Sequence, residues 1–298
     1  TRATAAVRSA GFQRALQGGG TDTLASAAHA TGDLDLTLKT GGSVTVTGAL
    51  VSNDILTAAA AYAVVLDGGG TVSAPVTFLN TGNLGIGAGF AFTGGVSKVS
   101  AGTRSLAGII STTDAAVDFG TAGTVVVPAS LTISSGTGAI SLAAATLADG
   151  VTLTLGNGMN AAVSLASVSG TALLAASNIT LATTGTVTAG GAIGTDIGTL
   201  SLGAAVLDMG ANSLSVSGDI SRTTGSITST GTVTLEGAGA QAVDFSGSTL
   251  AALAVANTGT VTNAGSFSVS SFTKTLAGTF TLALADTMSV SGSFIASA

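Results

Sequence analysis

The chain has 298 residues, of which only 7% are charged, and 8 lysines and arginines against 14 aspartates and glutamates give a formal net charge of −6. The absence of cysteine excludes disulfide scaffolds and cysteine-ligated zinc sites. The scarcity of basic residues excludes a nucleic-acid-binding face, and a hydrophobic fraction of 46% excludes an intrinsically disordered chain. Threonine, serine, asparagine and glycine must therefore form most of the surface.

The amino-terminal segment, residues 1–32, differs in composition from the rest of the chain. Residues 1–17 are rich in alanine, contain three arginines and place Val7, Phe12 and Leu16 at roughly helical spacing before a run of three glycines. We predict a short amphipathic helix or an extended arm here, so that residues 1–32 form a cap or an inter-subunit arm. The alternative is a frayed terminus.

From residue 33 onward the sequence alternates apolar and hydroxyl-bearing residues in short runs closed by glycine, asparagine or aspartate. This period of two is typical of strands with one buried face. The clearest runs are residues 34–38, 44–47, 151–155, 179–181, 214–217, 266–270, 280–284 and 288–294. No charged stretch with helical periodicity interrupts them, so the sequence predicts an all-β fold.

Partial self-similarity indicates how these strands are arranged. Thr-Gly-Thr-Val-Thr occurs at residues 184–188, 230–234 and 258–262, at unequal intervals. Strands every ~8–12 residues also suit a β-sandwich. The near-identical strand–turn units favour a single-stranded β-helix (a β-solenoid) over residues 33–298, in which turns of ~20–25 residues stack on one another.

The rest of the composition agrees with a stacked coil. A narrow core of small aliphatic residues leaves little room for large aromatic rings, and tryptophan is absent. Proline cannot donate to a β-ladder, and only Pro75 and Pro128 occur. No run approaches the ~18 consecutive apolar residues of a membrane-spanning helix, so we expect no membrane span.

Two segments resemble the repeats of large bacterial surface exoproteins of the filamentous-haemagglutinin type. They are residues 218–239, GDISRTTGSITSTGTVTLEGAG, and residues 241–271, QAVDFSGSTLAALAVANTGTVTNAGSFSVSS. The resemblance implies an exported β-helical fibre that serves adhesion, biofilm cohesion or surface coating. The chain departs from the two-partner secretion members, because Pro75 and Pro128 do not follow asparagine as in their Asn-Pro motifs.

Residues suited to catalysis are few and scattered. His29 is the single histidine, and no phosphate-binding glycine motif is present. Polysaccharide-active β-helices gather several carboxylates in one groove, whereas here only Asp114 and Asp118 lie close together in the sequence. We therefore predict that the protein is not an enzyme and has no catalytic, cofactor-binding or metal-binding residues.

Calcium is the one cofactor that the sequence leaves open as an alternative. Aspartate-rich turns bind this ion in secreted repeat proteins. Residues 18–22, GGGTD, and 67–70, DGGG, only partly match the Gly-Gly-x-Gly-x-Asp signature. Plain glycine-rich turns are the favoured explanation of both segments, so we expect no cofactor.

The functional hypothesis is a secreted or cell-surface structural protein that assembles head to tail into a filament, sheath or surface layer. Residues 288–294 form an uncharged strand at the carboxyl end, and an uncapped strand edge templates pairing with another chain. The alternative is a monomeric adhesin segment that binds a glycan or a host surface. A polysaccharide-active enzyme is a third, weaker hypothesis.

Overall fold

The computed structural model describes residues 2–3, 14–29, 31–98, 100–120, 123–171 and 175–296, and every regular element in these ranges is a β-strand. The predicted all-β fold is confirmed: the chain winds into a parallel β-solenoid of about 14 turns. It divides into two compact units, Thr1–Ala144 and Ala145–Ala298, each built in this way.

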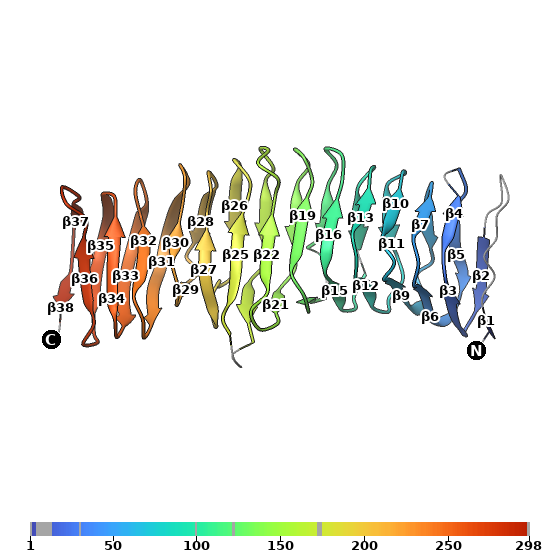
Figure 1. The fold of residues 1–298 in the computed structure, drawn as a ribbon, viewed down its shortest axis with the longest axis horizontal. Coiled ribbons are helices and arrows are strands. Elements are labelled where there is room, and N and C mark those ends of the chain that lie inside the picture. The colour runs from blue at the N-terminus through green and yellow to red at the C-terminus, as the bar shows by residue number, and fades with distance from the viewer. Residues whose placement is uncertain are drawn as a thin grey trace. The chain divides into compact units, whose positions relative to one another are not determined.

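Each turn of unit 1 contributes one strand to each of three faces, and strands of successive turns lie side by side in chain order (Figure 1). The first face contains β1 (Arg2–Ala3), β3 (Thr21–Leu24), β6 (Gly41–Val46), β9 (Ala61–Leu66), β12 (Leu84–Ile86), β15 (Arg104–Leu106) and β18 (Val125–Val127). The second contains β4 (Ala27–His29), β7 (Leu50–Ser52), β10 (Gly70–Val72), β13 (Phe90–Phe92), β16 (Gly108–Ser111) and β19 (Leu131–Ser134). The third contains two sheets in succession. The first is formed by β2 (Arg14–Gly18), β5 (Leu34–Lys39) and β8 (Ile55–Thr57), and the second begins with β11 (Val76–Phe78), β14 (Val96–Lys98), β17 (Val117–Phe119) and β20 (Ile140–Leu142).

Parallel pairing shows how long each turn is, because paired residues lie one turn apart. Leu84 lies opposite Val64 on one side and Arg104 on the other, so these successive turns are equal in length. Elsewhere in unit 1 the interval is longer, as between Val117 and its partner Ile140. The predicted turn length is therefore confirmed, and its variation is accommodated in the corner loops.

Unit 2 repeats the three-faced turn at first. Its first face begins with β21 (Ala145–Leu147), β24 (Val168–Gly170) and β29 (Leu214–Val216). Its second face contains β22 (Thr152–Leu155), β25 (Ser177–Leu181), β27 (Ile197–Ser201), β30 (Ile220–Ser221), β32 (Gln241–Asp244), β34 (Thr260–Ala264) and β36 (Thr279–Leu282). Its third face begins with β23 (Val163–Leu165), β26 (Thr186–Ala189) and β28 (Val206–Gly210).

Later turns of unit 2 lose a corner between the third and first faces. The long strands β31 (Ser226–Gly237), β33 (Thr249–Asn257) and β35 (Phe267–Lys274) continue from one face into the other. Strand β31 accordingly pairs with both β28 and β29. Its pairing with β33 shifts register between Ser229 and Thr232. The final strands are β37 (Met288–Val290) and β38 (Phe294–Ala296), so the single strand predicted over residues 288–294 is broken by a bend.

Alternate side chains point inward and form continuous columns. On the first face of unit 1, Val44, Val64 and Leu84 occupy the same register position on three successive turns and are fully buried. Phe90 and Phe92 stack within β13 with ring centroids 5.5 Å apart. The aliphatic core predicted from the alternation is thus present, and both prolines lie just outside strands, Pro75 before β11 and Pro128 after β18.

The corners also contain buried polar side chains, which the alternation does not predict. Arg104 follows Leu84 in the inward column, and Lys39, Lys98 and Asn80 are buried as well. In unit 2, Gln241 Nε2 donates to the carbonyl oxygen of Val216 at 3.1 Å. Side chains of this kind bind corner carbonyl groups that the ladders leave unpaired.

The amino-terminal prediction falls largely outside the described residues, because residues 1, 4–13 and 30 are among those not described. The described remainder of residues 1–32 forms β1, β2, β3 and β4. Strand β2 pairs in parallel with β5, and β3 with β6, so this part of the segment belongs to the first turns of unit 1.

Candidate functional site

The two neighbouring acids, Asp114 and Asp118, bind different parts of the backbone: Asp114 binds a residue one turn further along the chain, and Asp118, within strand β17, binds a residue two positions on. Asp114 Oδ1 accepts hydrogen bonds from the backbone nitrogen of Thr137 at 2.8 Å and from its hydroxyl at 3.1 Å, and these bonds lower the pKa of Asp114. Asp118 Oδ1 accepts from the backbone nitrogen of Gly120 at 2.9 Å. No hydrogen bond joins the two acids within the described ranges, and each carboxylate instead accepts from a backbone N–H group.

His29 ends strand β4, and its side chain lies outside the described residues. Among the side chains that the structure does describe, no three histidines, aspartates or glutamates gather as a metal site requires.

The first glycine-rich turn that resembles a calcium motif binds an ammonium group. Lys39 Nζ donates to the carbonyl oxygen of Gly20 at 2.6 Å and forms an ion pair with Asp22 Oδ2 at 2.9 Å. The Lys39 side chain is fully buried, so one carboxylate and one carbonyl of the turn already face a positive charge. The second such turn places Asp67 beside a hollow of about 490 Å³ over Gly85 and Gly87.

The last turn of unit 2 exposes an unusual amount of apolar surface. Leu284 is fully exposed, Phe294 is 58% exposed and Ile295 is 53% exposed. The Phe272 ring stacks on Phe294 at 5.1 Å and lies 5.3 Å from Phe280. These rings border a hollow of about 230 Å³ that opens the apolar core to solvent. We call residues 279–296 the terminal turn.

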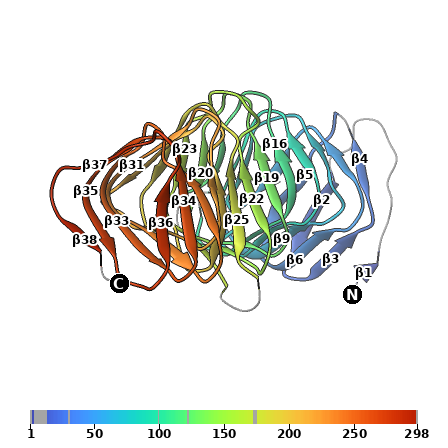
Figure 2. The same ribbon diagram turned by 60° about the vertical axis from the view of Figure 1, so that its left-hand side comes forward.

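Strand edges accompany this apolar surface. Strands β36, β37 and β38 are each the last of their ladders, and Figure 2 shows them at one end of unit 2. An edge strand carries unpaired backbone N–H and C=O groups that can pair with another strand. Within the terminal turn Asp286 is the one charged residue, so almost no charge protects these edges. Residues 288–294, which the sequence predicts as one uncharged strand, are divided between β37 and the first residue of β38.

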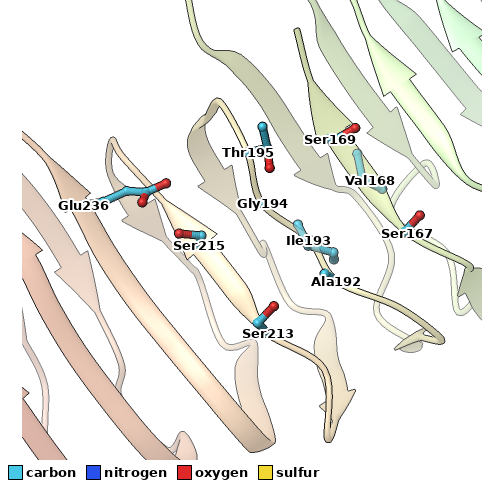
Figure 3. A pocket seen from close by; sticks show the side chains of 10 residues that line it. All are labelled: Ser167, Val168, Ser169, Ala192, Ile193, Gly194, Thr195, Ser213, Ser215 and Glu236. Carbon is cyan, nitrogen blue, oxygen red and sulfur yellow. The ribbon is translucent and has the colours of Figure 1, made fainter. Parts of the chain in front are cut away.

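A second candidate lies on the first face of unit 2, where three successive turns form a lateral groove of about 460 Å³. Ser167 and Ser169 flank it on one turn, and Ser213 and Ser215 flank it on another (Figure 3). Between them run residues 192–195, whose outward positions are occupied by Ala192 and Gly194. Glu236 reaches the groove from strand β31.

The sequence analysis missed this groove, although a signal for it exists. Val168, Ile193 and Leu214 pair in parallel, so the residues on either side of each must point outward. Two Ser-x-Ser runs then enclose an Ala-x-Gly run. The alternation pattern alone did not reveal the contrast, because each run lies a full turn from the next and the three align only once the turns are in register.

None of the described residues belongs to a helix whose length and hydropathy would suit a bilayer crossing.

Comparison of the chain with protein-family models, with curated proteins and with solved structures gives no match.

Proposed function

We propose that the protein is an extracellular structural subunit that assembles end to end into a filament, sheath or surface layer. The terminal turn supports this proposal most directly, because it combines unpaired strand edges with exposed Phe294, Ile295 and Leu284. Burial of apolar surface of this kind contributes ~25 cal/mol per Å² to association.

The geometry of a parallel coil favours an open polymer over a closed pair. A turn that continues the ladders of β36, β37 and β38 in parallel must present the opposite edge of a turn, as each turn does to the one before it. Contact between two different surfaces is heterologous, and a heterologous contact that does not close generates a fibre. A second copy of the chain supplies such an edge.

Composition supports the extracellular setting and the structural role. The chain has no cysteine to oxidise, few charges and many hydroxyl side chains. The resemblance of residues 218–239 and 241–271 to exported surface repeats points the same way, with adhesion as an associated role. We propose no catalytic activity for this protein.

Sedimentation velocity over a wide concentration range tests the proposal with a matched pair of variants. Phe294→Glu places a charge on the terminal turn, whereas Ile109→Glu places one on the lateral surface of β16, where the side chain is 55% exposed. We expect wild type and Ile109→Glu to form large species as concentration rises and Phe294→Glu to remain monomeric. A wild-type chain that stays monomeric throughout, or two variants that behave alike, would contradict it.

A further inference from the structure

We infer that the lateral groove of unit 2 is a binding site for an uncharged glycan chain. The groove lies on the first face, away from the terminal turn in the sequence, so this inference goes beyond the proposed assembly. Its volume of about 460 Å³ falls in the ~300–1,000 Å³ range of small-molecule sites.

The groove exists because the outward-facing residues of one turn have little or no side chain. Ile193 is buried between Val168 and Leu214, which forces Ala192 and Gly194 to face outward. A Cβ atom on Gly194 would lie 2.9 Å from Cβ of Ser215, closer than such atoms approach. Any larger residue at position 194 would therefore collide with the wall of the groove, and glycine keeps the floor low.

The walls present hydroxyl groups that are unused by the protein. Elsewhere outward hydroxyls pair between turns, as Ser97 Oγ does with Thr77 Oγ1 at 3.1 Å. In the part of the chain that the structure describes, the hydroxyls facing the groove have no hydrogen-bond partner; they belong to Ser167, Ser169, Thr195, Ser213 and Ser215. A hydroxyl both donates and accepts, which matches the hydroxyl groups of a sugar.

Glu236 adds an acceptor of a different kind. Its side chain lies beside Ser215 of β29 (Figure 3). An ionised carboxylate accepts hydrogen bonds only, and its two oxygens can each take one from neighbouring hydroxyls of a sugar ring. This group fixes the direction of the hydrogen bonds and so favours a polyol over a carbonyl-rich ligand.

Charge decides which sugars fit. Unit 2 contains seven acidic and two basic residues, a formal charge of −5. Arg222 is paired with Asp244 at 3.1 Å, Lys274 donates to the carbonyl oxygen of Leu276 at 2.8 Å, and neither lines the groove. Uronates and sulfated sugars would therefore meet net repulsion, whereas an uncharged glycan would not.

The arrangement of the walls suits a chain ligand. Parallel neighbouring strands lie ~4.8 Å apart, so the two serine pairs, which lie two turns apart on either side of residues 192–194, are separated by about twice that distance. A polymer with hydroxyls on every unit can engage several turns at once. Because no aromatic ring lines the groove, recognition rests on hydrogen bonds and shape.

A glycan array tests this inference, with cello-, malto-, manno- and N-acetylchito-oligosaccharides as uncharged probes and oligogalacturonates and sulfated oligosaccharides as acidic ones. We expect wild type to bind at least one uncharged class and no acidic class. Ala192→Phe, which fills the groove, should abolish binding. Glu236→Gln should weaken binding about tenfold, since hydrogen bonds to a charged acceptor are the stronger ones.

Ala242→Phe is the matched control, because it makes the same change at an exposed alanine on the second face of unit 2. It should bind as wild type does. Binding of acidic probes alone, no binding of any uncharged probe, or equal binding by Ala192→Phe would overturn the inference. Ala192→Phe should sediment as wild type does. The glycan-binding inference and the assembly proposal can therefore be contradicted separately.

Discussion

At the scale of single residues, the buried polar side chains of unit 1 bind carbonyl groups of the corner loops. Lys98 Nζ donates to the carbonyl oxygen of Asn80 at 2.5 Å and to Ser100 Oγ at 3.0 Å. Arg104 Nη2 donates to the carbonyl oxygens of Lys98 at 2.8 Å and Ser100 at 3.1 Å. These side chains replace the ladder bonds that the backbone cannot make while it turns.

Burial of Lys98 makes stability depend on pH. Desolvation, with the nearby Arg104 charge, lowers the pKa of Lys98 to about 8. The unfolded chain, with an ordinary lysine pKa of ~10.4, binds more protons than the folded chain between these two values, so stability rises with pH from about 8 to ~10.4. Lys98→Met should remove this rise, as urea unfolding at pH 7 and pH 10 will measure.

Lys274→Met serves as the control for that experiment. The Lys274 ammonium donates to the carbonyl oxygen of Leu276 in an exposed hydrogen bond. This variant should keep the wild-type difference in unfolding midpoint between the two pH values. A difference that survives unchanged in Lys98→Met would show that the buried lysine is not its source.

The hydroxyl group of Tyr62 also binds backbone groups in the interior of unit 1. Its hydroxyl donates to the carbonyl oxygen of Leu36 at 3.2 Å and accepts from the backbone nitrogen of Ala58 at 2.9 Å, and the side chain is fully buried. Tyr62→Phe keeps the ring but leaves both backbone groups unpaired. We expect the free energy of unfolding to fall by about 1–3 kcal/mol in denaturant titration. A loss below about 0.5 kcal/mol would mean that water replaces the hydroxyl.

At the scale of the element, glycine allows the corners of successive turns to approach closely. Gly70 begins β10 with φ of +152°, and a Cβ there would collide with the carbonyl oxygen of Leu50 on the preceding turn. Both the backbone conformation and the contact exclude a side chain. Gly20, in contrast, has open space around its Cβ position.

Gly70→Ala and Gly20→Ala therefore form a matched test of corner packing. We expect Gly70→Ala to lower the free energy of unfolding by about 1–3 kcal/mol and Gly20→Ala to leave it nearly unchanged. Denaturant titration of both variants measures the contrast. Equal losses would indicate that chain entropy, rather than the contact with Leu50, determines which residues the corners accept.

Strands were predictable from sequence because each obeys a local period of two. Residues 34–38 alternate visibly and form β5, and residues 151–155 contain β22. The buried Arg104 was not predicted, although the period of two places it on the same face as the buried Leu106. A charged residue in a short strand otherwise suggests an exposed face.

The candidate sites divide in the same way. The exposed terminal turn could be anticipated, since residues 288–294 lack charge locally. The lateral groove could not, because it arises from Ala192 and Gly194 lying between serines of other turns. The groove is defined by which residues of neighbouring turns lie side by side. The sequence of a single turn does not reveal this alignment.

At the scale of the whole molecule, both units have the same parallel winding, an apolar interior and a surface of hydroxyl groups with few charges. Low charge removes a common barrier to edge-to-edge association. A net charge of −6 spread over 298 residues gives little long-range repulsion at physiological salt. Association should therefore depend on the apolar and backbone groups of the terminal turn.

Electron cryo-microscopy of the purified protein over rising concentration tests end-to-end assembly most directly. The predicted result is filaments in which the ~4.8 Å strand spacing continues without a break across the junction between subunits, with Phe294 buried there. Isolated particles at every concentration, or filaments joined through lateral faces with the terminal turn exposed to solvent, would contradict it.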